Sequence, residues 1–253
     1  MAHSPLTEGE SLSKTAVPSR RRPREGGYPR GDEARARLIE AGVKIFGEQG
    51  YDQASTRAIA SEARVTPPAL QYYFDGKEGL HLACGQFMVA HMSEILCEPF
   101  NLAAAALKKR NAPAAAEALC SLLETMLDFS LASDLSPGRG RFLARAQADG
   151  AGPAFPSVRD GVVRPLHRVC TALVAAAMEI SARDDEARLV AILLMNHLSA
   201  FNTNRDNTLA ALNWTDFQGN RARTAKRTLR RLVLCAIAAD GVRRSPLKKR
   251  RVT

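Results

Sequence analysis

The chain lacks any hydrophobic stretch long enough to cross a membrane. Its longest apolar run, Leu189 to Met195, ends at Asn196, well short of the roughly 18 to 20 apolar residues that a spanning helix needs. The first 31 residues also lack the apolar segment of a secretory signal, although they contain several arginines. We therefore expect a cytoplasmic protein that has no membrane partner.

Cysteine is scarce and scattered, and the usual catalytic motifs are missing. The five cysteines form no C-x-x-C pair, which argues against a disulfide framework or a zinc knuckle. His81, Cys84 and His91 have a spacing that could face a metal, but residues of an ordinary helix core share it. No G-x-S-x-G or H-E-x-x-H motif occurs, and residues 138–140 lack the third glycine of a phosphate loop. We expect no catalytic residues, no metal and no cofactor.

Positive charge is in clear excess and is concentrated at the two ends. The formal net charge is +10, from 36 Lys and Arg against 26 Asp and Glu, which favours a polyanionic partner. Residues 1–31 are rich in Ser, Pro, Gly and Arg without a hydrophobic period, so we expect a disordered basic arm. Residues 242–253 form a second basic tail. This tail resembles a nuclear import signal, and in a bacterium it would be an accessory phosphate-binding tail.

Apolar residues recur at steps of three and four along the rest of the chain, and no alternating runs with hairpin turns occur. The fold class is therefore all-α. We expect the first helix to open with Asp32 as N-cap and to end near Gly47 or Gly50. Residues 187–201 are apolar nearly all round, which is typical of a helix buried on both sides. Later helices are expected at about 99–110, 113–132, 137–147, 157–180 with Pro165 dividing it, 185–203 and 216–240.

A helix-turn-helix is indicated over residues 56–74. Thr56 is expected to cap a short helix, residues 64–66 to turn the chain, and Pro67 to start a second short helix. The apolar positions that can lock the two helices together are Ile59, Ala63, Val65, Leu70 and Phe74. The next four residues, 75–78, have the pattern of an Asp cap with a Glu three residues later. They are expected to open a long helix that links two domains.

This region resembles the N-terminal domain of the TetR family of bacterial transcriptional regulators. The resemblance covers about residues 33–88 and rests on residues 41–51 (Ala-Gly-Val-Lys-Ile-Phe-Gly-Glu-Gln-Gly-Tyr), the pattern Thr56-x-x-Ile-Ala-x-x-Ala-x-Val-Thr, and the exit Tyr-Tyr-Phe-x-x-Lys-Glu. A generic helix-turn-helix would not share the entry and exit motifs. Arg64 replaces the usual turn glycine, which costs roughly 1 kcal/mol in a left-handed turn, and Gln71 replaces a common tyrosine.

The resemblance implies a homodimer that binds a pseudo-palindromic operator in double-stranded DNA. It places Thr56, Tyr72 and Lys77 against phosphates, and positions 66, 68 and 71 against base edges. A structural role stays open for the first three, namely a helix cap, a packed aromatic and a solvated charge. The residues assigned to DNA contact are Thr56, Arg57, Thr66, Pro67, Pro68, Gln71, Tyr72 and Lys77.

The chain from Phe142 onward more loosely resembles the C-terminal domain of the CerR or CecR subgroup of that family. The resemblance rests on residues 153–155, on Pro165-Leu166 and on the stretch 197–214, and it implies a helical bundle that dimerises and binds a small-molecule effector. The subgroup often has a Glu after the Arg where this chain has Arg145-Ala146, so no role of that Glu carries over. Candidate effector residues are Met88, Arg145, His197, Phe201 and Trp214.

The last expected helix has small and apolar residues at steps of three and four, which would allow close packing against a second subunit. The candidate interface residues are Leu194, Leu198, Leu229, Leu232 and Ala236. Trp214 suits a pocket wall as well as ordinary core packing. His197 interrupts a helix expected to be buried, so it needs a partner in the protein or in a ligand.

Four segments follow from this reading: a disordered basic arm over 1–31, a helix-turn-helix domain over 32–76, an effector-binding and dimerisation domain over 77–241, and a basic tail over 242–253. We expect a sequence-specific regulator, a repressor that a small molecule releases from its operator. The alternative is a helical enzyme or ligand carrier whose basic ends bind RNA or membranes nonspecifically. That alternative predicts no preference among duplex sequences, whereas a regulator should prefer one operator by orders of magnitude.

Overall fold

The computed structural model describes residues 29–132, 138–148 and 152–238, and every regular element in these ranges is helical. The predicted all-α class is thereby confirmed. The arm was predicted over 1–31, but residues 29–31 are helical in α1, and the rest of the predicted arm lies outside the described residues, as does the predicted tail. The helices are α1 (Pro29–Gln49), α2 (Thr56–Glu62), α3 (Pro67–Phe74), α4 (Lys77–Lys109), α5 (Ala112–Leu131), α6 (Arg139–Ala148), α7 (Phe155–Val158), the π-helical turn Arg159–Val163, α8 (Arg164–Ala177), α9 (Asp185–Thr203), α10 (Arg205–Leu212) and α11 (Asn220–Ala238).

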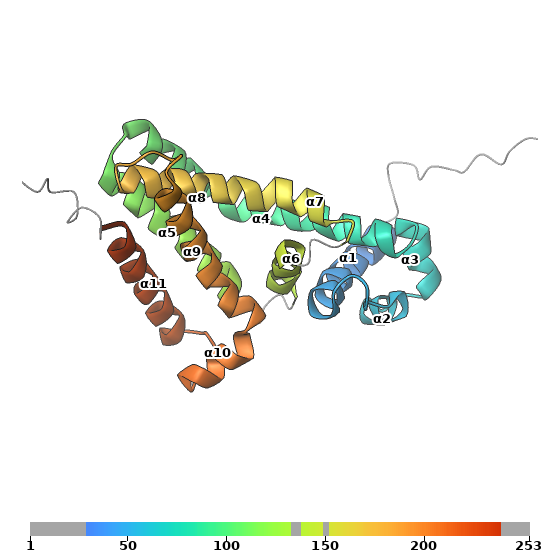
Figure 1. Cartoon of the computed structure of the whole chain (residues 1–253). Helices are drawn as coiled ribbons and strands as arrows, with labels where there is room; N and C mark the ends of the chain where they lie inside the picture. The colour runs from blue at the N-terminus through green and yellow to red at the C-terminus, as the bar shows by residue number, and fades with distance from the viewer. Residues whose placement is uncertain (1–28, 133–137, 149–151, 239–253) are drawn as a thin grey trace, which may run out of the picture.

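The long helix α4 organises the molecule (Figure 1). It starts beside α1–α3 at one end and runs to the opposite end, where α5, α8, α9 and α11 pack into a bundle. With 33 residues it is about 50 Å long. The short helix α6 lies between the two ends and packs on both α1 and α9. Within the described ranges, no helix is long and apolar enough to cross a bilayer.

The α4 helix corrects the prediction of a separate helix over 99–110. Pro99 lies inside α4 and is buried, so the chain continues through it despite the lost backbone donor. The helix ends at Arg110, which adopts a left-handed conformation with φ 50°. The side chain of Asn111 then caps α5 by accepting a hydrogen bond from the Ala114 amide over 2.9 Å. The true boundary therefore comes at a cap and not at the proline.

The first helix begins at Pro29, before the predicted cap Asp32. Asp32 instead lies in the first turn, where its carboxylate faces the positive end of the helix dipole. Further along, Pro165 divides the predicted helix 157–180 as expected, because the π-helical turn Arg159–Val163 directly precedes α8. A proline has no amide hydrogen and its ring displaces the carbonyl four residues earlier, which explains a widened turn at that place.

Helix α9 has the predicted bounds but not the predicted surroundings. Its Ala187, Ala191 and Leu198 are buried where it packs on α5 and α8. The opposite side is exposed, with 58% of Leu189 and 56% of Leu193 accessible. The prediction of burial on both sides is therefore wrong for the single chain. Helix α10 was missed because its Asn-rich flanks look like a loop, and α11 starts later than residue 216.

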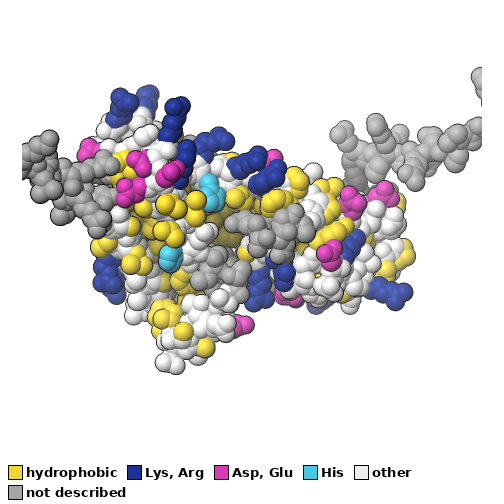
Figure 2. All heavy atoms as spheres, viewed as in Figure 1, with side chains coloured by type: hydrophobic (Ala, Val, Ile, Leu, Met, Phe, Trp, Pro, Cys, Tyr) yellow, Lys and Arg dark blue, Asp and Glu magenta, His cyan; other side chains and the backbone are white. Residues whose placement is uncertain are grey.

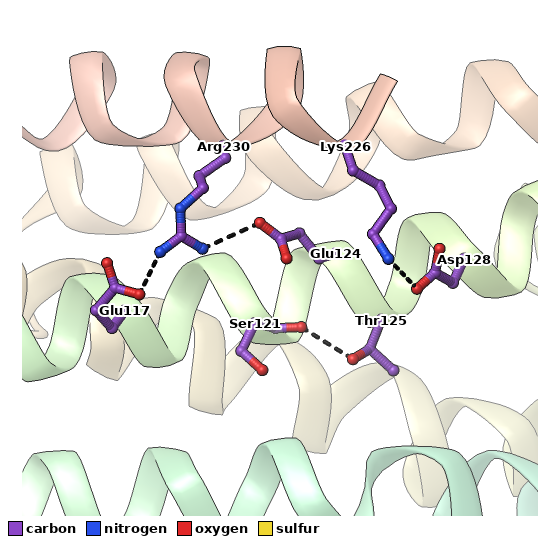
Figure 3. A network of polar contacts seen from close by, with 7 residues as sticks. All are labelled: Glu117, Ser121, Glu124, Thr125, Asp128, Lys226 and Arg230. Atoms are coloured by element: carbon purple, nitrogen blue, oxygen red, sulfur yellow. Dashed lines mark hydrogen bonds and ion pairs between the residues drawn. The ribbon is translucent and has the colours of Figure 1, made fainter. Parts of the chain in front are cut away.

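Helix α11 is held on α5 by apolar packing and by ion pairs (Figure 3). Arg230 bonds the carboxylates of Glu117 and Glu124, the latter over 3.1 Å. Lys226 pairs with Asp128 over 2.7 Å. The buried residues of α11 are Leu229, Val233 and Ile237. Part of the predicted inter-subunit seam is thus used inside the protomer.

Candidate functional site

The helix-turn-helix forms with a different N-cap from the predicted one. Ser55, not Thr56, precedes α2 in an extended conformation, and its Oγ accepts a hydrogen bond from the Ala58 amide over 3.4 Å. Thr56 is the first helical residue, so its predicted capping role is corrected. In the turn, Arg64 adopts φ 54°, the left-handed conformation that the family's glycine would take more easily. Its amide donates to the Ser61 carbonyl over 3.0 Å, which closes the turn.

The exit from α3 also differs from the predicted cap pattern. Asp75 ends α3 in a left-handed conformation with φ 56°, and Gly76 with φ 111° precedes α4. The Asp75 carboxylate accepts a hydrogen bond from Gln71 Nε2 over 3.1 Å. It is therefore a C-cap of α3 that orients Gln71, and the predicted capping box with Glu78 is wrong.

The two short helices pack on one another and on α1. The residues buried between them are Ile59, Ala60, Ala63, Leu70 and Phe74, with Val65 packed against that core. Lys44 of α1 pairs with Glu62 over 2.7 Å, and Arg37 Nε donates to the Ala63 carbonyl over 3.2 Å. These contacts fix α2 and α3 relative to α1, so their outer face is presented as a rigid surface.

Most residues predicted to contact DNA lie on that outer face. The exposed ones are Arg57, Thr66, Pro67, Pro68, Gln71 and Tyr72, whereas Thr56 and Lys77 are half-buried. Tyr72 is 77% exposed, and its ring makes an edge-on contact with that of Tyr73, so it is not a packed core aromatic. Exposed Arg64, which sequence reasoning treated only as a departure in the turn, adds a positive charge beside α3.

Lys77 has a structural role in the chain itself. Its Nζ donates to the Asp52 carbonyl over 3.0 Å and lies 4.8 Å from the centre of the Tyr51 ring. This contact joins the start of α4 to the segment between α1 and α2. The ammonium group has three donor hydrogens, so a phosphate contact and this structural contact are compatible.

The positive excess does not reside on the helix-turn-helix. Residues 32–76 contain five Lys and Arg against seven Asp and Glu. Residues 1–31 contain six against three, and residues 242–253 contain six against none. The helix-turn-helix therefore provides shape and hydrogen-bonding groups, whereas most of the net positive charge lies in residues 1–31 and 242–253.

Helix α6 fastens the C-terminal bundle to the end of α1. Arg145 donates to the backbone carbonyls of Gly47 and Glu48 over 2.9 and 3.0 Å, and Arg139 pairs with Glu40 over 2.7 Å. A Cβ at Gly47 would lie 2.4 Å from the carbonyl oxygen of residue 138, so only glycine permits this approach. Arg145, a predicted effector residue, is thus placed at the junction between the two ends of the molecule.

His81 occupies the same junction and is buried. Its Nδ1 accepts a hydrogen bond from the Ala154 amide over 3.1 Å, and its ring lies 4.7 Å from those of Phe46 and Tyr51 and 5.4 Å from that of Phe142. Burial, with a smaller contribution from the Lys77 charge, lowers the pKa of His81 to about 4. The imidazole is therefore neutral at pH 7.

The metal alternative weighed for His81 finds no support in its neighbours. Cys84 Sγ lies 3.5 Å from the Ile39 carbonyl, and His91 Nε2 lies 3.0 Å from Arg139. Across the described part of the chain, no group of three or more His, Cys, Asp or Glu side chains is arranged to hold a metal ion.

A cavity of about 70 Å³ lies between α5, α6, α8 and α9. Its polar lining residues are Ser130, His167, Cys170 and Asn196. The other lining residues are apolar or glycine: Leu122, Leu123, Met126, Phe129, Gly140, Leu143, Ala144, Leu166, Met195 and Leu198. Residues 122–198 thus supply a pocket that no local sequence pattern marks.

The residues predicted to bind an effector do not line this cavity. Met88 is fully buried in the core, and His197 is exposed on α9. Phe201 and Trp214 both pack edge-on against Phe217, with ring centres 5.4 and 5.9 Å apart. The core interpretation of Trp214 therefore agrees with its contacts.

An exposed helix-turn-helix joined through α4 and α6 to a helical bundle with its own cavity defines a DNA-binding regulator. Residues 38–84 match the profile of bacterial regulatory proteins of the tetR family, and residues 115–239 match that of the C-terminal domain of the HTH-type transcriptional dual regulator CecR. The CecR protein of Shigella flexneri is 30% identical over 203 residues, which are 79% of this chain and 89% of the relative. The chain belongs to the TetR family, and both its family and its relative are transcriptional regulators, not enzymes.

Solved structures agree with this fold. A TetR-like transcriptional regulator from Rhodococcus sp. RHA1 superposes with a TM-score of 0.57 at 20% identity, covering 83% of this chain and 96% of the other. HlyIIR, a hemolysin II transcriptional regulator, superposes with a TM-score of 0.52 at 16% identity, covering 83% and 97%. The family predicted from the motifs at residues 41–78 and the subgroup resemblance of the C-terminal part are both confirmed.

Proposed function

We propose that the chain is a homodimeric repressor that binds a pseudo-palindromic operator and is released from it by a small-molecule effector. The observation that carries the DNA-binding part is the outer face of α3. There Gln71 and the 77% exposed Tyr72 point away from a core that α1 and α2 hold rigid. A pair of such helices, related by a twofold axis, would enter successive major grooves of one operator.

The second copy would pack on the exposed side of α9 and on α11. Leu189, Ile192 and Leu193 of α9 are 58%, 40% and 56% exposed, and Leu232 of α11 is 56% exposed. Figure 2 shows hydrophobic side chains gathered on the face along which α9 runs. An apolar surface of this kind is typical of a subunit interface.

The predicted interface residues divide between two roles. Leu198 and Leu229 are buried inside the protomer, and Leu194 is half-buried against the core. Leu232 is exposed and Ala236 is half-buried. We therefore centre the proposed interface on Leu193 and its α9 neighbours, with Leu232 at its α11 side.

Effector release is supported by the position of α6. One side of this helix lines the cavity, and the other side is anchored on the C-terminal end of α1 through Arg145. A ligand that displaces α6 would move α1, and with it α2 and α3, which α1 carries. The distance between the two recognition helices of a dimer would then change, and operator affinity would fall.

A second regulatory mode is favoured by the relative, which is by name a dual regulator. On that basis the same chain would repress one promoter and activate another. A reporter assay on each selected operator distinguishes the two modes. Deletion of a pure repressor raises the expression of every target gene, whereas deletion of a dual regulator lowers the expression of some of them.

The test of operator recognition is selection of genomic fragments by the full chain, followed by footprinting. We expect one pseudo-palindromic sequence, bound at least a thousandfold more tightly than a scrambled duplex. The variant Gln71→Ala is the matched control, because it keeps both basic ends and the phosphate contacts and should lose only part of the preference. Equal affinity of the unmodified chain for operator and scrambled duplex would instead support a helical carrier that binds polyanions nonspecifically.

A further inference from the structure

The cavity between α5, α6, α8 and α9 contains no formal charge. None of the side chains that line it is Asp, Glu, Lys or Arg. Burial lowers the pKa of His167, which keeps its imidazole neutral at pH 7, and burial raises the pKa of Cys170 to about 12, which keeps its thiol protonated. A charged ligand would therefore leave water without gaining a counter-charge, so this cavity disfavours charged ligands relative to neutral ones.

Hydrogen bonding in the cavity comes from few groups. Ser130 Oγ already donates to the Met126 carbonyl over 3.0 Å. Among the described residues, the ring of His167 has no hydrogen-bond partner, and it lines the cavity. A neutral imidazole has one donor and one acceptor nitrogen, so it can bond a hydroxyl in either direction.

The remaining wall suits a flat apolar body. Phe129 offers an aromatic ring, and Met126 and Met195 offer thioethers. Thioether sulfur is polarizable and makes favourable contacts with aromatic rings, and unbranched Met side chains adapt to irregular shapes. A ring-shaped ligand therefore fits this lining better than a polar chain.

The size of the cavity links ligand entry to movement of α6. An engineered protein cavity that binds benzene has about 150 Å³, roughly twice the 70 Å³ available between these helices. A ligand with one aromatic ring would therefore push the wall outward. Gly140, Leu143 and Ala144 of α6 form part of that wall, on the helix that Arg145 anchors to α1.

We propose that the effector is an uncharged, mainly apolar molecule of at least one aromatic ring, with a hydrogen-bonding group that contacts His167. The proposal rests on the proposed effector function of this cavity. It excludes carboxylates, phosphates and cationic amines as effectors, and it assigns to His167 a direct ligand contact.

The experiment compares three probes of the same size and different charge: benzyl alcohol, benzoate and benzylamine, which is cationic at pH 7. Calorimetric titration of the full chain should show binding of benzyl alcohol, with benzoate and benzylamine at least tenfold weaker. Binding of either charged probe as tightly as benzyl alcohol, or no binding of benzyl alcohol up to its solubility limit, would overturn the proposal.

Variants test the assignment to this cavity. Ala144→Leu fills the space from α6 and should abolish benzyl alcohol binding, whereas Arg141→Ala on the exposed side of the same helix should leave it unchanged. His167→Phe should reduce the preference for benzyl alcohol over toluene about tenfold, and His167→Gln should restore part of it. The His167 variants keep the test valid if Ala144→Leu does not fold, and unaltered selectivity in His167→Phe would contradict the ligand contact.

Operator binding without any probe is measured on the same samples. Selective operator binding together with failure of the probe series would refute the ligand class and leave the regulatory function standing. Loss of operator selectivity in the unmodified chain would refute the proposed function itself.

Discussion

The two ends of the molecule build their candidate sites in different ways. At the DNA-binding end, the candidate residues come from one stretch, 56–77, and most of them are exposed on α2, on α3 or in the turn between them. At the bundle end, the cavity takes residues from α5, α6, α8 and α9, over positions 122–198. A surface site made by one local motif is visible in the sequence, whereas a site assembled from distant helices emerges only when they pack.

Helix α6 is the element that both ends share, and its two sides differ in chemistry. Toward α1 it uses charged and backbone groups, with Arg145 on the carbonyls of Gly47 and Glu48. Toward the cavity it uses apolar side chains and glycine. Hydrogen bonds depend steeply on distance and angle, so they hold α6 in one position relative to α1, whereas apolar contacts tolerate small shifts. The difference explains how a small movement at the cavity would reach α1.

The largest expected effect concerns the proposed subunit interface, on which operator binding by a pair of recognition helices depends. Leu193→Asp places a charge on the exposed side of α9 and should convert the dimer to monomers, because burying an unpaired carboxylate costs several kcal/mol. Operator affinity should then fall by more than a hundredfold. Light scattering and a gel-shift titration measure the two effects.

Leu212→Asp is the matched control for this substitution. Leu212 is 43% exposed on α10 and is not among the residues assigned to the proposed interface. It should leave the dimer and the operator affinity unchanged. A Leu193→Asp variant that remains dimeric would remove α9 from the interface.

The next effect is the pH dependence of stability at the junction, where His81 contacts both ends. The pKa of His81 is lowered to about 4 in the folded chain, against about 6.5 in the unfolded chain. The unfolded state therefore binds more protons between these values, and stability present above pH 6.5 is lost as the pH falls toward 4. This loss should reach at most about 3 kcal/mol.

Denaturant unfolding at several pH values checks this expectation against His81→Phe. The variant removes the titrating group and keeps an aromatic ring between Phe46 and Phe142. Its stability should fall less steeply below pH 6.5, although its carboxylates titrate as before. Identical slopes for the two proteins would show that His81 does not titrate with a lowered pKa.

Removal of the hydrogen bonds between α6 and the end of α1 should have a smaller effect. Arg145→Ala removes two hydrogen bonds from a charged donor, worth about 1 to 2 kcal/mol at this partly exposed position. Amide hydrogen exchange in α1–α3 should become roughly tenfold faster, with exchange in α5 and α8 unchanged. Arg141→Ala, on the exposed side of α6, is the control. Faster exchange throughout the bundle would mean that Arg145 stabilises the whole fold and not the junction.

The contrast between a local motif at one end and an assembled site at the other also explains how much of the structure could be predicted from the sequence. Periodicity placed α9 almost to the residue, and the motif placed α2, α3 and the turn at Arg64. Cap residues were missed because Ser55 and Thr56 are chemically equivalent caps, and only their backbone dihedrals decide between them. Asp75 was misassigned for the same reason, since it adopts a left-handed C-cap.

The cavity and the contacts of the bundle end could not be predicted from the sequence, for a different physical reason. His167 and Met126 lie on α8 and α5, and only tertiary packing brings them to one cavity. Arg145 was recognised as a residue with a function, but its distance of 97 positions from Glu48 hid the contact with α1. The exposed side of α9 has the composition of a buried helix, because a surface that would be covered in an assembly and a protomer core have the same apolar residues.

At the DNA-binding end, Gln71→Ala should act on sequence preference. The Gln71 amide is oriented by Asp75 and exposed on α3, so its loss should relax discrimination at one base pair by about 1 to 3 kcal/mol. Competition among operators with single substitutions measures this effect. Asp75→Asn is the matched control, since it can still accept from Gln71 and should retain the preference. A uniform loss of affinity across all competitors would assign Gln71 to the DNA backbone instead.

The smallest expected effect separates two roles of Lys77. If its ammonium contacts a phosphate, Lys77→Ala should weaken binding to every duplex a few-fold and reduce the slope of log affinity against log salt by about 0.9. If it only donates a hydrogen bond to the Asp52 carbonyl, the variant should lower the melting temperature and leave that slope unchanged. Lys109→Ala removes the same charge at the far end of α4, where Lys109 is exposed, and should leave the slope as it is. Since the ammonium has three donors, both signals together are the expected result for Lys77→Ala, and a change in melting temperature alone would remove Lys77 from the DNA interface.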